Sequence, residues 1–578
     1  MGGVLGGVTV VVVIVGAALV LDVRTAHAEL RMAADQVRTL QAQVEAGDRE
    51  GAAATAMELP EHTAKARQAT YGPHWTLLGK VPGLGVNVHA VQTVSAVVDD
   101  IAAGALSDLI EAVQVVDPSR MAPVEGRIAL APIVDVAPQV VRADETVQSA
   151  RSTLEGVDSN ALAEQLRGPV AELTGQVDAI ASITATASRA VRLIPPMLGS
   201  EGPREYLLLV QNNAEPRATG GIPGAVVLLR ADQGAIELVE QRPASSFGPF
   251  DEPVVEVTNV ERAMFGTQLG RYMQDVTFTP DFPRSAEIAG EMWRREVGTD
   301  VDGVLSIDPV ALQTLLQATG PVVLVNGQEL TSENAAEILL NQVYLELETP
   351  SAQDKFFAMA AGTIFSSVMS GAADPASMVG LLDQVAEEGR LMMWSAHARE
   401  QALLAGTTLS GELRGSTRGA PVVGVYVNDR SAAKIGYYQD VRAEIEANTC
   451  RGDGSRVFTL VVTVSSSVPE NYIELPAYLT GGGQTVPVGN IRSDVLVYAP
   501  TGGRILGARS SDEATSYTPR LHNGLSMGTH KLELLPQQSV TFEYDIETGP
   551  NQAGTPLVRM TPGPKDGQFL PLASPCRS

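Results

Sequence analysis

Aromatic side chains are scarce in this chain. They make up only 4% of its 578 residues, although apolar residues reach 44%. The packed interiors must therefore be built mainly from Ala, Val, Leu and Ile. Because a chain of this length exceeds what one hydrophobic core supports, we expect three or four domains.

Positive charge is also in short supply. Lysine and arginine together number 41 against 67 Asp and Glu, which gives a formal net charge of −26. A polyanion repels nucleic acid and anionic lipid headgroups, so we expect no nucleic-acid partner, although local basic pockets stay open. The six lysines among those 41 cations indicate a GC-rich bacterial genome.

Sequence signatures of common catalytic sites are missing. The chain contains no P-loop, nucleophile elbow, H-E-x-x-H or kinase signature, and its seven histidines do not cluster. The two cysteines, Cys450 and Cys576, lack metal-ligand spacing. They form either one disulfide, which would pin the C-terminal tail to the last domain, or two independent thiols.

The first 21 residues carry no charged side chain, and Asp22 and Arg24 end this run. At about 1.5 Å per residue the run is long enough to cross a bilayer. We therefore expect a transmembrane anchor over residues 1–23, with the bulk of the chain extracytoplasmic at the cell membrane. A cleaved signal peptide is the alternative, because Ala26-His27-Ala28 fits the cleavage pattern.

Apolar spacing and turn residues divide the rest of the chain. Val170, Leu173, Val177 and Ile180 recur at three and four residues, as in packed helices. Alternating strands and helices indicate an α/β sandwich, and strand-like runs separated by glycine turns indicate a β-sandwich. We expect a multidomain α+β protein with a helical stalk (24–200), an α/β core domain (203–372), a helical linker (373–419), a β-sandwich (420–550) and an extended tail (551–578).

The segment Tyr206–Gly224, YLLLVQNNAEPRATGGIPG, carries the strongest site signal. A buried strand is followed at once by polar residues and a glycine turn, and polar groups at a strand's carboxyl end form binding sites in α/β domains. The predicted ligand contacts are Asn212, Asn213, Glu215 and Arg217. The alternative is that the Asn and Glu residues close a polar turn and that Arg217 neutralises Glu215.

Glycines and acidic residues add to this prediction. Gly220, Gly221 and Gly224 let a backbone approach a ligand closely. Asp281 either holds Mg²⁺ through its carboxylate or is a capping or loop residue before a helix. Asp308, which precedes a proline, is expected to cap a helix.

Three segments resemble the bacterial family catalogued as domain of unknown function 4012: YLLLVQNNAEPRATGG, TPDFPRSAEIAGEMW and VDGVLSIDPVALQTLLQATGPVVLVNGQELTSENAAEILL. This resemblance covers roughly residues 200–370. The helical N-terminal part, and a C-terminal module that opens with VNDRSAAKIGYY, are also similar to the family's arrangement. The resemblance implies an actinobacterial source and leaves the activity open.

The order of elements resembles, more distantly, the LytR-CpsA-Psr proteins, membrane-anchored phosphotransferases that move glycopolymers from a polyprenyl-pyrophosphate carrier to peptidoglycan. This resemblance implies one arginine after the first strand and another after the hairpin, and Arg217 and Arg242 fall there. Mg²⁺ would assist only if a pyrophosphate binds. Lys355 is what remains of an arginine-rich segment, and Ala218-Thr219-Gly220 stands where an Asp is expected.

Two function hypotheses follow. The favoured one is a membrane-anchored cell-envelope protein with a degenerate phosphotransferase-like core, which binds or scaffolds in envelope or surface-glycopolymer assembly. The alternative is an active transferase. The expected partners are the membrane, through the N-terminal helix, and a polyprenyl-phosphate-linked glycan. If Arg217 and Arg242 converge on one pocket near Asp281 or Lys355, the hypothesis that this domain binds a glycopolymer precursor gains support.

Overall fold

The computed structural model describes residues 2–45, 48–115, 122–347, 349–371, 373–417, 419–512, 516–552, 554–565 and 568–570. The chain forms two compact units. The first comprises residues 1–121 and 129–197, and the second comprises residues 122–128 and 198–578.

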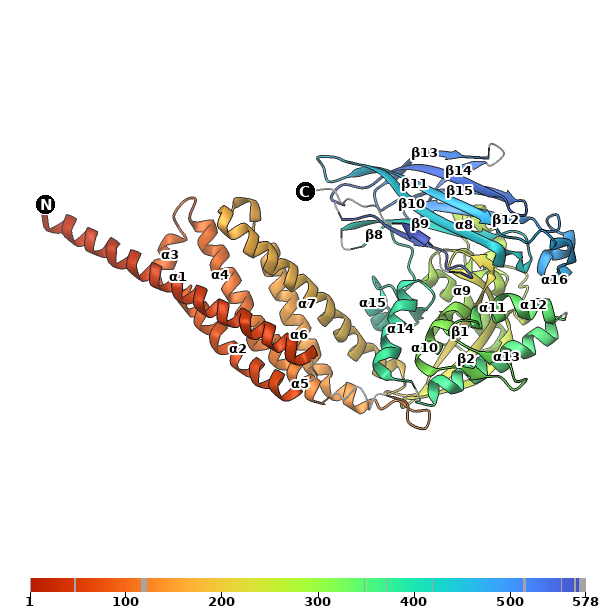
Figure 1. The fold of residues 1–578 in the computed structure, drawn as a ribbon, viewed down its shortest axis with the longest axis horizontal. Coiled ribbons are helices and arrows are strands. Elements are labelled where there is room, and N and C mark those ends of the chain that lie inside the picture. The colour runs from red at the N-terminus through yellow and green to blue at the C-terminus, as the bar shows by residue number, and fades with distance from the viewer. Residues whose placement is uncertain are drawn as a thin grey trace. The chain divides into compact units, whose positions relative to one another are not determined.

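Long helices build the first unit, which is drawn in red to orange in Figure 1. Small apolar side chains fill the contacts between the helices, as where Val97, Ala150 and Val177 form one buried cluster. Ile180, at the end of the predicted stripe, is instead exposed. The helices are α1 (Gly2–Glu45), α2 (Arg49–Ala69), α3 (Pro73–Leu78), α4 (Gly85–Asp100), α5 (Ser107–Val115), α6 (Ala131–Glu155) and α7 (Glu164–Met197).

Among the residues that the structure describes, no helix is long and apolar enough to cross a membrane. This finding corrects the expected transmembrane anchor over residues 1–23 and the expected single-pass membrane location. Helix α1 does not end at Asp22 and Arg24 but continues to Glu45. Asp22 also lies 2.6 Å from His74 on α3. The charged residues expected to end an apolar span are therefore interior positions of a longer helix that packs against a neighbour.

A five-stranded sheet forms the α/β module of the second unit, in the order β3-β2-β1-β4-β7. Strand β1 pairs antiparallel with β2 and parallel with β4. Strand β7 comes from the segment predicted as a linker and completes the sheet. The strands are β1 (Arg204–Arg217), β2 (Gly220–Asp232), β3 (Ala235–Pro243), β4 (Gly303–Ile307) and β7 (Met392–Ser395).

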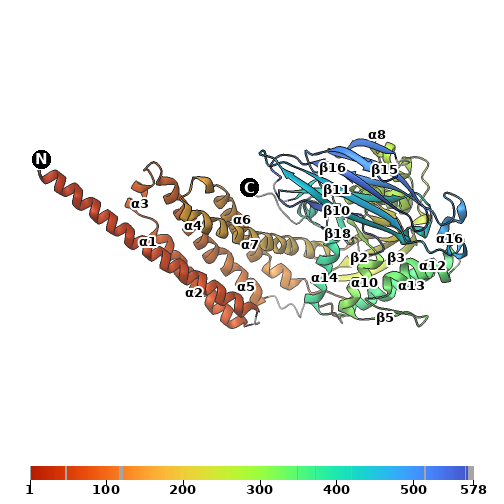
Figure 2. The same cartoon turned by 45° about the horizontal axis from the view of Figure 1, so that its top comes forward.

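Helices flank this sheet. Met292 and Trp293 of α9 pack against Leu207 and Leu209 of β1 in one buried cluster. Figure 2 shows α10, α13 and α14 along the lower side of the module. The helices are α8 (Asn259–Phe265), α9 (Phe282–Val297), α10 (Pro309–Thr319), α11 (Ala335–Glu337), α12 (Val343–Glu346), α13 (Pro350–Met369), α14 (Pro375–Glu387) and α15 (Ala398–Leu404), with a short hairpin of β5 (Val322–Val323) and β6 (Glu329–Leu330).

Two further sheets form a β-sandwich, in the orders β13-β16-β11-β10-β18 and β14-β15-β12-β9-β17, with β8 paired to β9. Strands β17 and β18 come from the segment predicted as an extended tail. The elements are β8 (Ser416–Thr417), β9 (Ala420–Asp429), β10 (Gln439–Cys450), β11 (Arg456–Ser466), α16 (Ala477–Thr480), β12 (Ile491–Tyr498), β13 (Arg504–Ser510), β14 (Tyr517–His522), β15 (Leu525–Leu534), β16 (Ser539–Glu547), β17 (Leu557–Met560) and β18 (Gln568–Leu570).

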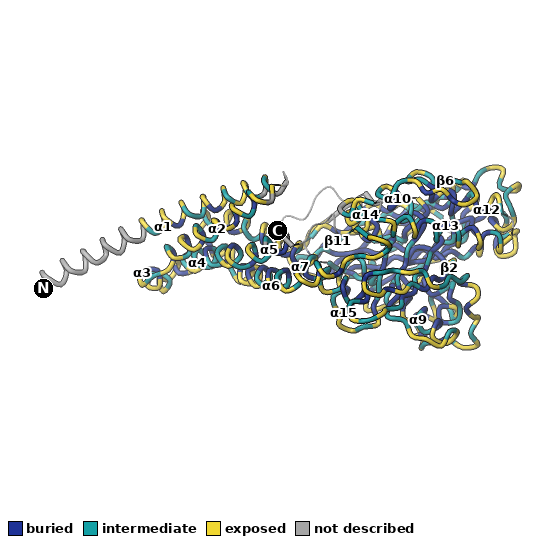
Figure 3. Tube along the Cα trace, turned by 90° about the horizontal axis from the view of Figure 1, so that it is seen from below, coloured by how far each residue is buried: buried dark blue, intermediate teal, exposed yellow. Residues whose placement is uncertain are grey.

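The β-sandwich and the α/β module share an interior. Val495 and Val497 of β12 face the core of the sandwich, whereas Leu496 and Tyr498 pack into the cluster that holds Trp293 of the α/β module. Alternate side chains of a strand point to opposite faces, so a strand buried on both faces needs a continuous apolar run. Figure 3 shows the resulting concentration of buried residues in this unit. The outer face of β9, β12 and β15 is therefore the docking face of the sandwich.

Candidate functional site at the end of the first strand

The polar residues after the buried part of β1 continue the strand instead of forming a loop. A bulge at Asn212–Pro216 interrupts the pairing with β2. Within it, Asn212 Oδ1 accepts a hydrogen bond from Ala214 N at 3.0 Å. Gln211 Oε1 accepts one from Gly221 N at 2.6 Å. The hairpin therefore satisfies its own backbone groups with side chains, as bulged strands do.

The glycine at position 221 is required by this hairpin itself. A Cβ atom on Gly221 would lie 2.2 Å from Asn212 O, well inside any tolerable contact. At Gly224 the nearest atom to an added Cβ would be Val210 O, at an ordinary 3.8 Å. The close backbone approach that the sequence suggested for a ligand is thus made by the chain's own second strand at Gly221.

Arg217 is enclosed by other parts of the protein and is only 5% exposed. Its guanidinium lies 3.6 Å from Asp275 Oδ1 and 3.9 Å from Asp429 Oδ2. The ring of Phe278 lies 4.5 Å from Arg217 Cζ, and Nη1 donates to Pro216 O at 3.1 Å. Its Nε has no hydrogen-bond partner among the described residues. Two carboxylates and an aromatic ring thus surround the charge.

The two carboxylates around Arg217 come from different modules. Asp275 precedes α9 in the α/β module, and Asp429 ends β9 in the sandwich. Burial raises the pKa of Asp429 to about 6, although Arg217 pulls it down. Burial likewise raises the pKa of Asp275 against the attraction of Arg217. Arg217 is therefore a cation that links the two modules by charge.

A second buried ion pair joins the modules nearby. Lys434 Nζ, from the short helical turn that follows β9, lies 2.5 Å from Glu215 Oε1. Both side chains are nearly buried, at 10% and 13% exposure. Burial opposes the ionisation of Glu215, yet Lys434 and Arg217 hold its pKa below its ordinary value. Lys434 also lies over the ring of Tyr344. Glu215 is thus paired chiefly with Lys434, and Arg217 contributes at longer range.

The two asparagines complete this polar junction, which we define as Asn212, Asn213, Glu215 and Arg217 with their partners. Asn212 Nδ2 donates to the hydroxyl of Tyr344. Asn213 Nδ2 donates to Asp308 Oδ2 at 3.0 Å and to Pro562 O at 2.9 Å. The polar junction therefore ties β1 to α12, to the start of α10 and to the chain that follows β17.

Arg242 lies apart from the polar junction. It is on β3, where its Nε donates to Glu240 Oε1 at 2.6 Å and its guanidinium lies 5.7 Å from the ring of Trp293. No contact partner of Arg242 in the described chain is shared with Arg217. The two arginines that the resemblance placed in one clamp thus have separate surroundings.

Asp281 and Lys355 also have separate surroundings. Asp281 precedes α9, and its Oδ1 accepts a hydrogen bond from Leu413 N at 3.0 Å. Burial raises the pKa of its carboxyl group. Lys355 is exposed on α13. Over the ranges that the structure describes, no three His, Cys, Asp or Glu side chains are grouped so that they could hold a metal ion.

Cys450 ends β10 and is disulfide-bonded. Its predicted partner, Cys576, lies outside the described residues. The pairing between the two therefore stays a prediction.

A cavity of about 290 Å³ lies beside the turn that follows Arg217. Its lining includes Ala218 and Thr219 of the turn, together with side chains of both charges. One of them, Arg390, is buried and lies 2.9 Å from Asp308 Oδ2. The lining of this cavity includes none of the residues predicted to contact a ligand, which are Asn212, Asn213, Glu215, Arg217, Arg242, Asp281 and Lys355.

Sequence reasoning missed most partners of the polar junction. Asp429 and Lys434 stand in VNDRSAAKIGYY, a segment already singled out, and Asp275 lies four residues before the start of TPDFPRSAEIAGEMW. Opposite charges in separate modules indicate docking only when the fold brings them together. More than 200 residues separate Arg217 from Asp429, and no local pattern spans that distance.

The fold and the polar junction define an α+β protein in which an α/β module is fastened to a β-sandwich by a shared core and buried ion pairs. Residues 201–344 match the family described as "Protein of unknown function (DUF4012)". This match supports the expected resemblance to that family over the segment from β1 to α12. No curated protein matches the chain. The actinobacterial source and the LytR-CpsA-Psr resemblance stay predictions.

Proposed function

We propose that this chain is a non-catalytic binding or scaffold protein in surface-glycopolymer assembly. Its α/β module keeps an element order similar to that of a phosphotransferase core, but it uses the end of β1 to hold the β-sandwich. A fold shared with enzymes does not itself carry their activity, which depends on the groups that remain available at the site.

The observation that carries this proposal is the enclosure of Arg217. A pyrophosphate clamp needs guanidinium donors that face a ligand. Here the guanidinium lies between Asp275 and Asp429, at 3.6 and 3.9 Å. A diphosphate at Arg217 would have to displace these carboxylates or suffer their repulsion. Arg242, the second arginine of the expected clamp, is paired with Glu240 elsewhere.

A transfer assay tests the proposal directly. In the transferase reaction an acceptor hydroxyl attacks the phosphorus next to the sugar, the pyrophosphate P–O bond breaks, polyprenyl monophosphate leaves, and the hydroxyl proton goes to solvent. The full chain would be incubated with a polyprenyl-pyrophosphate-linked oligosaccharide, a peptidoglycan fragment and Mg²⁺, with polyprenyl phosphate followed by ³¹P NMR. We expect release no faster than in a protein-free control. Faster release that Arg217→Lys abolishes without a change in thermal stability would overturn the proposal.

A stability comparison tests the structural role of Arg217. Replacing Arg217 by Met removes the guanidinium that faces the buried Asp429 and the partly buried Asp275, which costs about 3–5 kcal/mol. The same replacement at Arg242, whose side chain is 33% exposed, removes a surface pair worth about 1 kcal/mol or less. Thermal unfolding of both variants should therefore show a large loss only for Arg217→Met. Equal, small losses would mean that Arg217 is not structural.

A further inference from the structure

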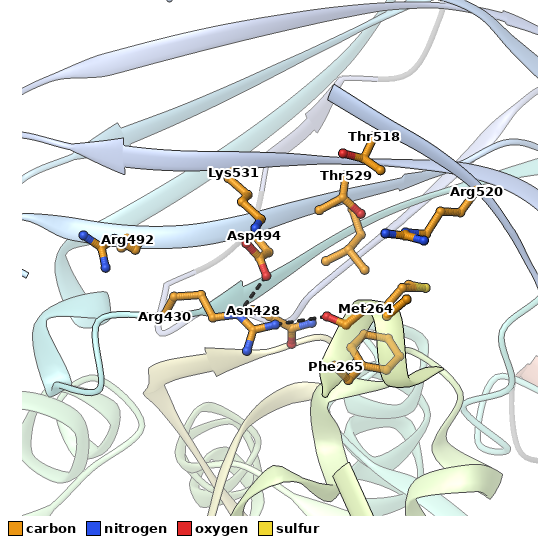
Figure 4. A pocket seen from close by; sticks show the side chains of 12 residues that line it. Met264, Phe265, Asn428, Arg430, Arg492, Asp494, Thr518, Arg520, Thr529 and Lys531 are labelled. Atoms are coloured by element: carbon orange, nitrogen blue, oxygen red, sulfur yellow. Dashed lines mark hydrogen bonds and ion pairs between the residues drawn. The ribbon is translucent and has the colours of Figure 1, made fainter. Parts of the chain in front are cut away.

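The docking face of the sandwich continues beyond the part that the α/β module covers, and a pocket opens there. The pocket has a volume of about 390 Å³. Figure 4 shows strands of the sandwich on one side of it and Met264 and Phe265 of α8 on the other. A volume of this size suits a small ligand such as a monosaccharide derivative.

The register of the sheet explains why polar side chains meet in this pocket. Thr518 of β14 lies directly opposite Thr529 of β15. On the other side of β15, Lys531 lies opposite Asp494 of β12, which in turn lies opposite Asn428 of β9. Cross-strand neighbours of this kind have Cβ atoms about 5 Å apart. One polar row therefore crosses three strands at the point where the apolar docking face ends.

Cations outnumber anions in the lining by four to one. Two of these cations already have partners. Arg430 Nε donates to Asp494 Oδ2 at 2.7 Å, and Arg492 pairs with Glu533 at 2.8 Å. The four lining cations are Arg430, Arg492, Arg520 and Lys531, and the lining anion is Asp494.

The other two cations, Arg520 and Lys531, make no ion pair or side-chain hydrogen bond with any residue that the structure describes. The same holds for the hydroxyls of Thr518 and Thr529. Figure 4 shows Arg520 extending from β14 toward the pocket and Lys531 above Asp494. Two unpaired cations and two free hydroxyls thus face one cavity in a chain whose net charge is −26.

We propose that this pocket binds a phosphate monoester carried on a sugar-sized body. A monoester carries about two negative charges near neutral pH, which matches the two unpaired cations. The guanidinium of Arg520 offers a fork, Lys531 a point charge, and the threonines hydroxyl donors, so that donors approach a tetrahedral anion from several directions. Met264 and the edge of Leu496 supply apolar surface for the body of the ligand. The pocket adjoins the polar junction, because Arg430 in its lining lies 4.7 Å from the ring of Phe278, which Arg217 also contacts. The proposed ligand contacts Arg520 and Lys531 are not partners of Arg217.

Calorimetric titration of the full chain with glucose 1-phosphate in low salt tests the proposal. We expect saturable binding that inorganic phosphate competes with and that glucose does not. Raising the salt concentration should weaken it, because the contacts are exposed charges. Weaker binding of inorganic phosphate than of glucose 1-phosphate would assign a role to the sugar body, and equal binding would restrict the site to the phosphate group. No saturable binding up to 10 mM, taken as roughly the weakest affinity worth assigning, would overturn the proposal.

Variants locate the binding. Arg520→Ala and Lys531→Ala should each weaken glucose 1-phosphate at least about tenfold, since each removes a charge-assisted hydrogen bond. Arg399→Ala and Lys80→Ala remove exposed cations elsewhere and should leave the affinity unchanged. Thermal unfolding of all four checks that each is folded. Binding that survives in both pocket variants would place the anion elsewhere and overturn the assignment, whereas the transfer assay and the Arg217 variants decide the proposed function independently.

Discussion

The buried pair of Glu215 and Lys434 allows the docking role of the polar junction to be measured as a free energy. The perturbations are Glu215→Gln, Lys434→Met and the two combined. Each single change leaves one charge nearly buried without its partner, which costs about 3–5 kcal/mol. The double change leaves two neutral side chains and should cost less than either single change, because no uncompensated charge is left.

The magnitude can be converted into an unfolding temperature. The unit that contains both modules has roughly 390 residues, so at about 2.1 cal/mol/K per residue its unfolding entropy is about 0.8 kcal/mol/K. A loss of about 4 kcal/mol then lowers the transition by about 5 °C. The pair holds the pKa of Glu215 below 4.5 and that of Lys434 above 10.5. The stabilisation by this pair is therefore lost only as the pH falls below 4.5, where Glu215 takes up a proton, or rises above 10.5, where Lys434 loses one. It is complete at pH 7.5.

Tryptophan fluorescence during thermal unfolding at pH 7.5 is the assay. Trp293 and Trp394 report on the α/β module, and a Trp75→Phe background removes the signal of the helical unit. Shifts below about 1 °C for both single variants would refute the reasoning, since an exposed pair behaves in that way. A double variant whose loss equals the sum of the single losses would refute it too, because the two charges would then not be coupled.

Two other changes test the hairpin and the sandwich core. Gly221→Ala should destabilise the protein by several kcal/mol, because its Cβ would lie 2.2 Å from Asn212 O. The control Gly224→Ala should change the unfolding temperature little. Equal decreases in the unfolding temperature of the two variants would contradict the hairpin geometry. Burial lowers the pKa of His530 to about 4, so its contribution to stability is complete above pH 6.5 and is lost as pH falls from 6.5 toward 4, by about 3 kcal/mol at most. As the pH is lowered from 7.5 to 5, His530→Phe should therefore gain stability relative to the unmodified chain, and the exposed control His89→Phe should not. If the unfolding temperatures of all three proteins changed with pH in the same way, a buried neutral imidazole at His530 would be contradicted.

Much of the secondary structure could be predicted from the periodic parts of the sequence. Strand β11 alternates buried and partly exposed residues along its whole length, and a period of two is visible in any sequence. Asp308 was expected to cap a helix, and its Oδ1 accepts a hydrogen bond from Ala311 N at 2.7 Å. These features could be predicted because each depends on residues close together in the chain.

The membrane segment shows the limit of that approach. A run without charge was interpreted as a span ended by Asp22 and Arg24, whereas α1 continues through both residues to Glu45. Side-chain charge ends an apolar run, but it does not end a helix. Where a helix stops depends on caps and on packing partners such as His74, which lies 52 residues from Asp22.

The sequence by itself determined the apolar periods, the caps and the presence of a polar segment after a buried strand. Only the tertiary structure decided that this segment is a closed junction, because Asp429 and Lys434 reach Arg217 and Glu215 across more than 200 residues of chain. The same folding left Arg520 and Lys531 unpaired at the edge of the docking face. Whether a charged side chain is neutralised or available to a ligand depends on its neighbours in space. The sequence alone does not give the distance between residues that are far apart in the chain.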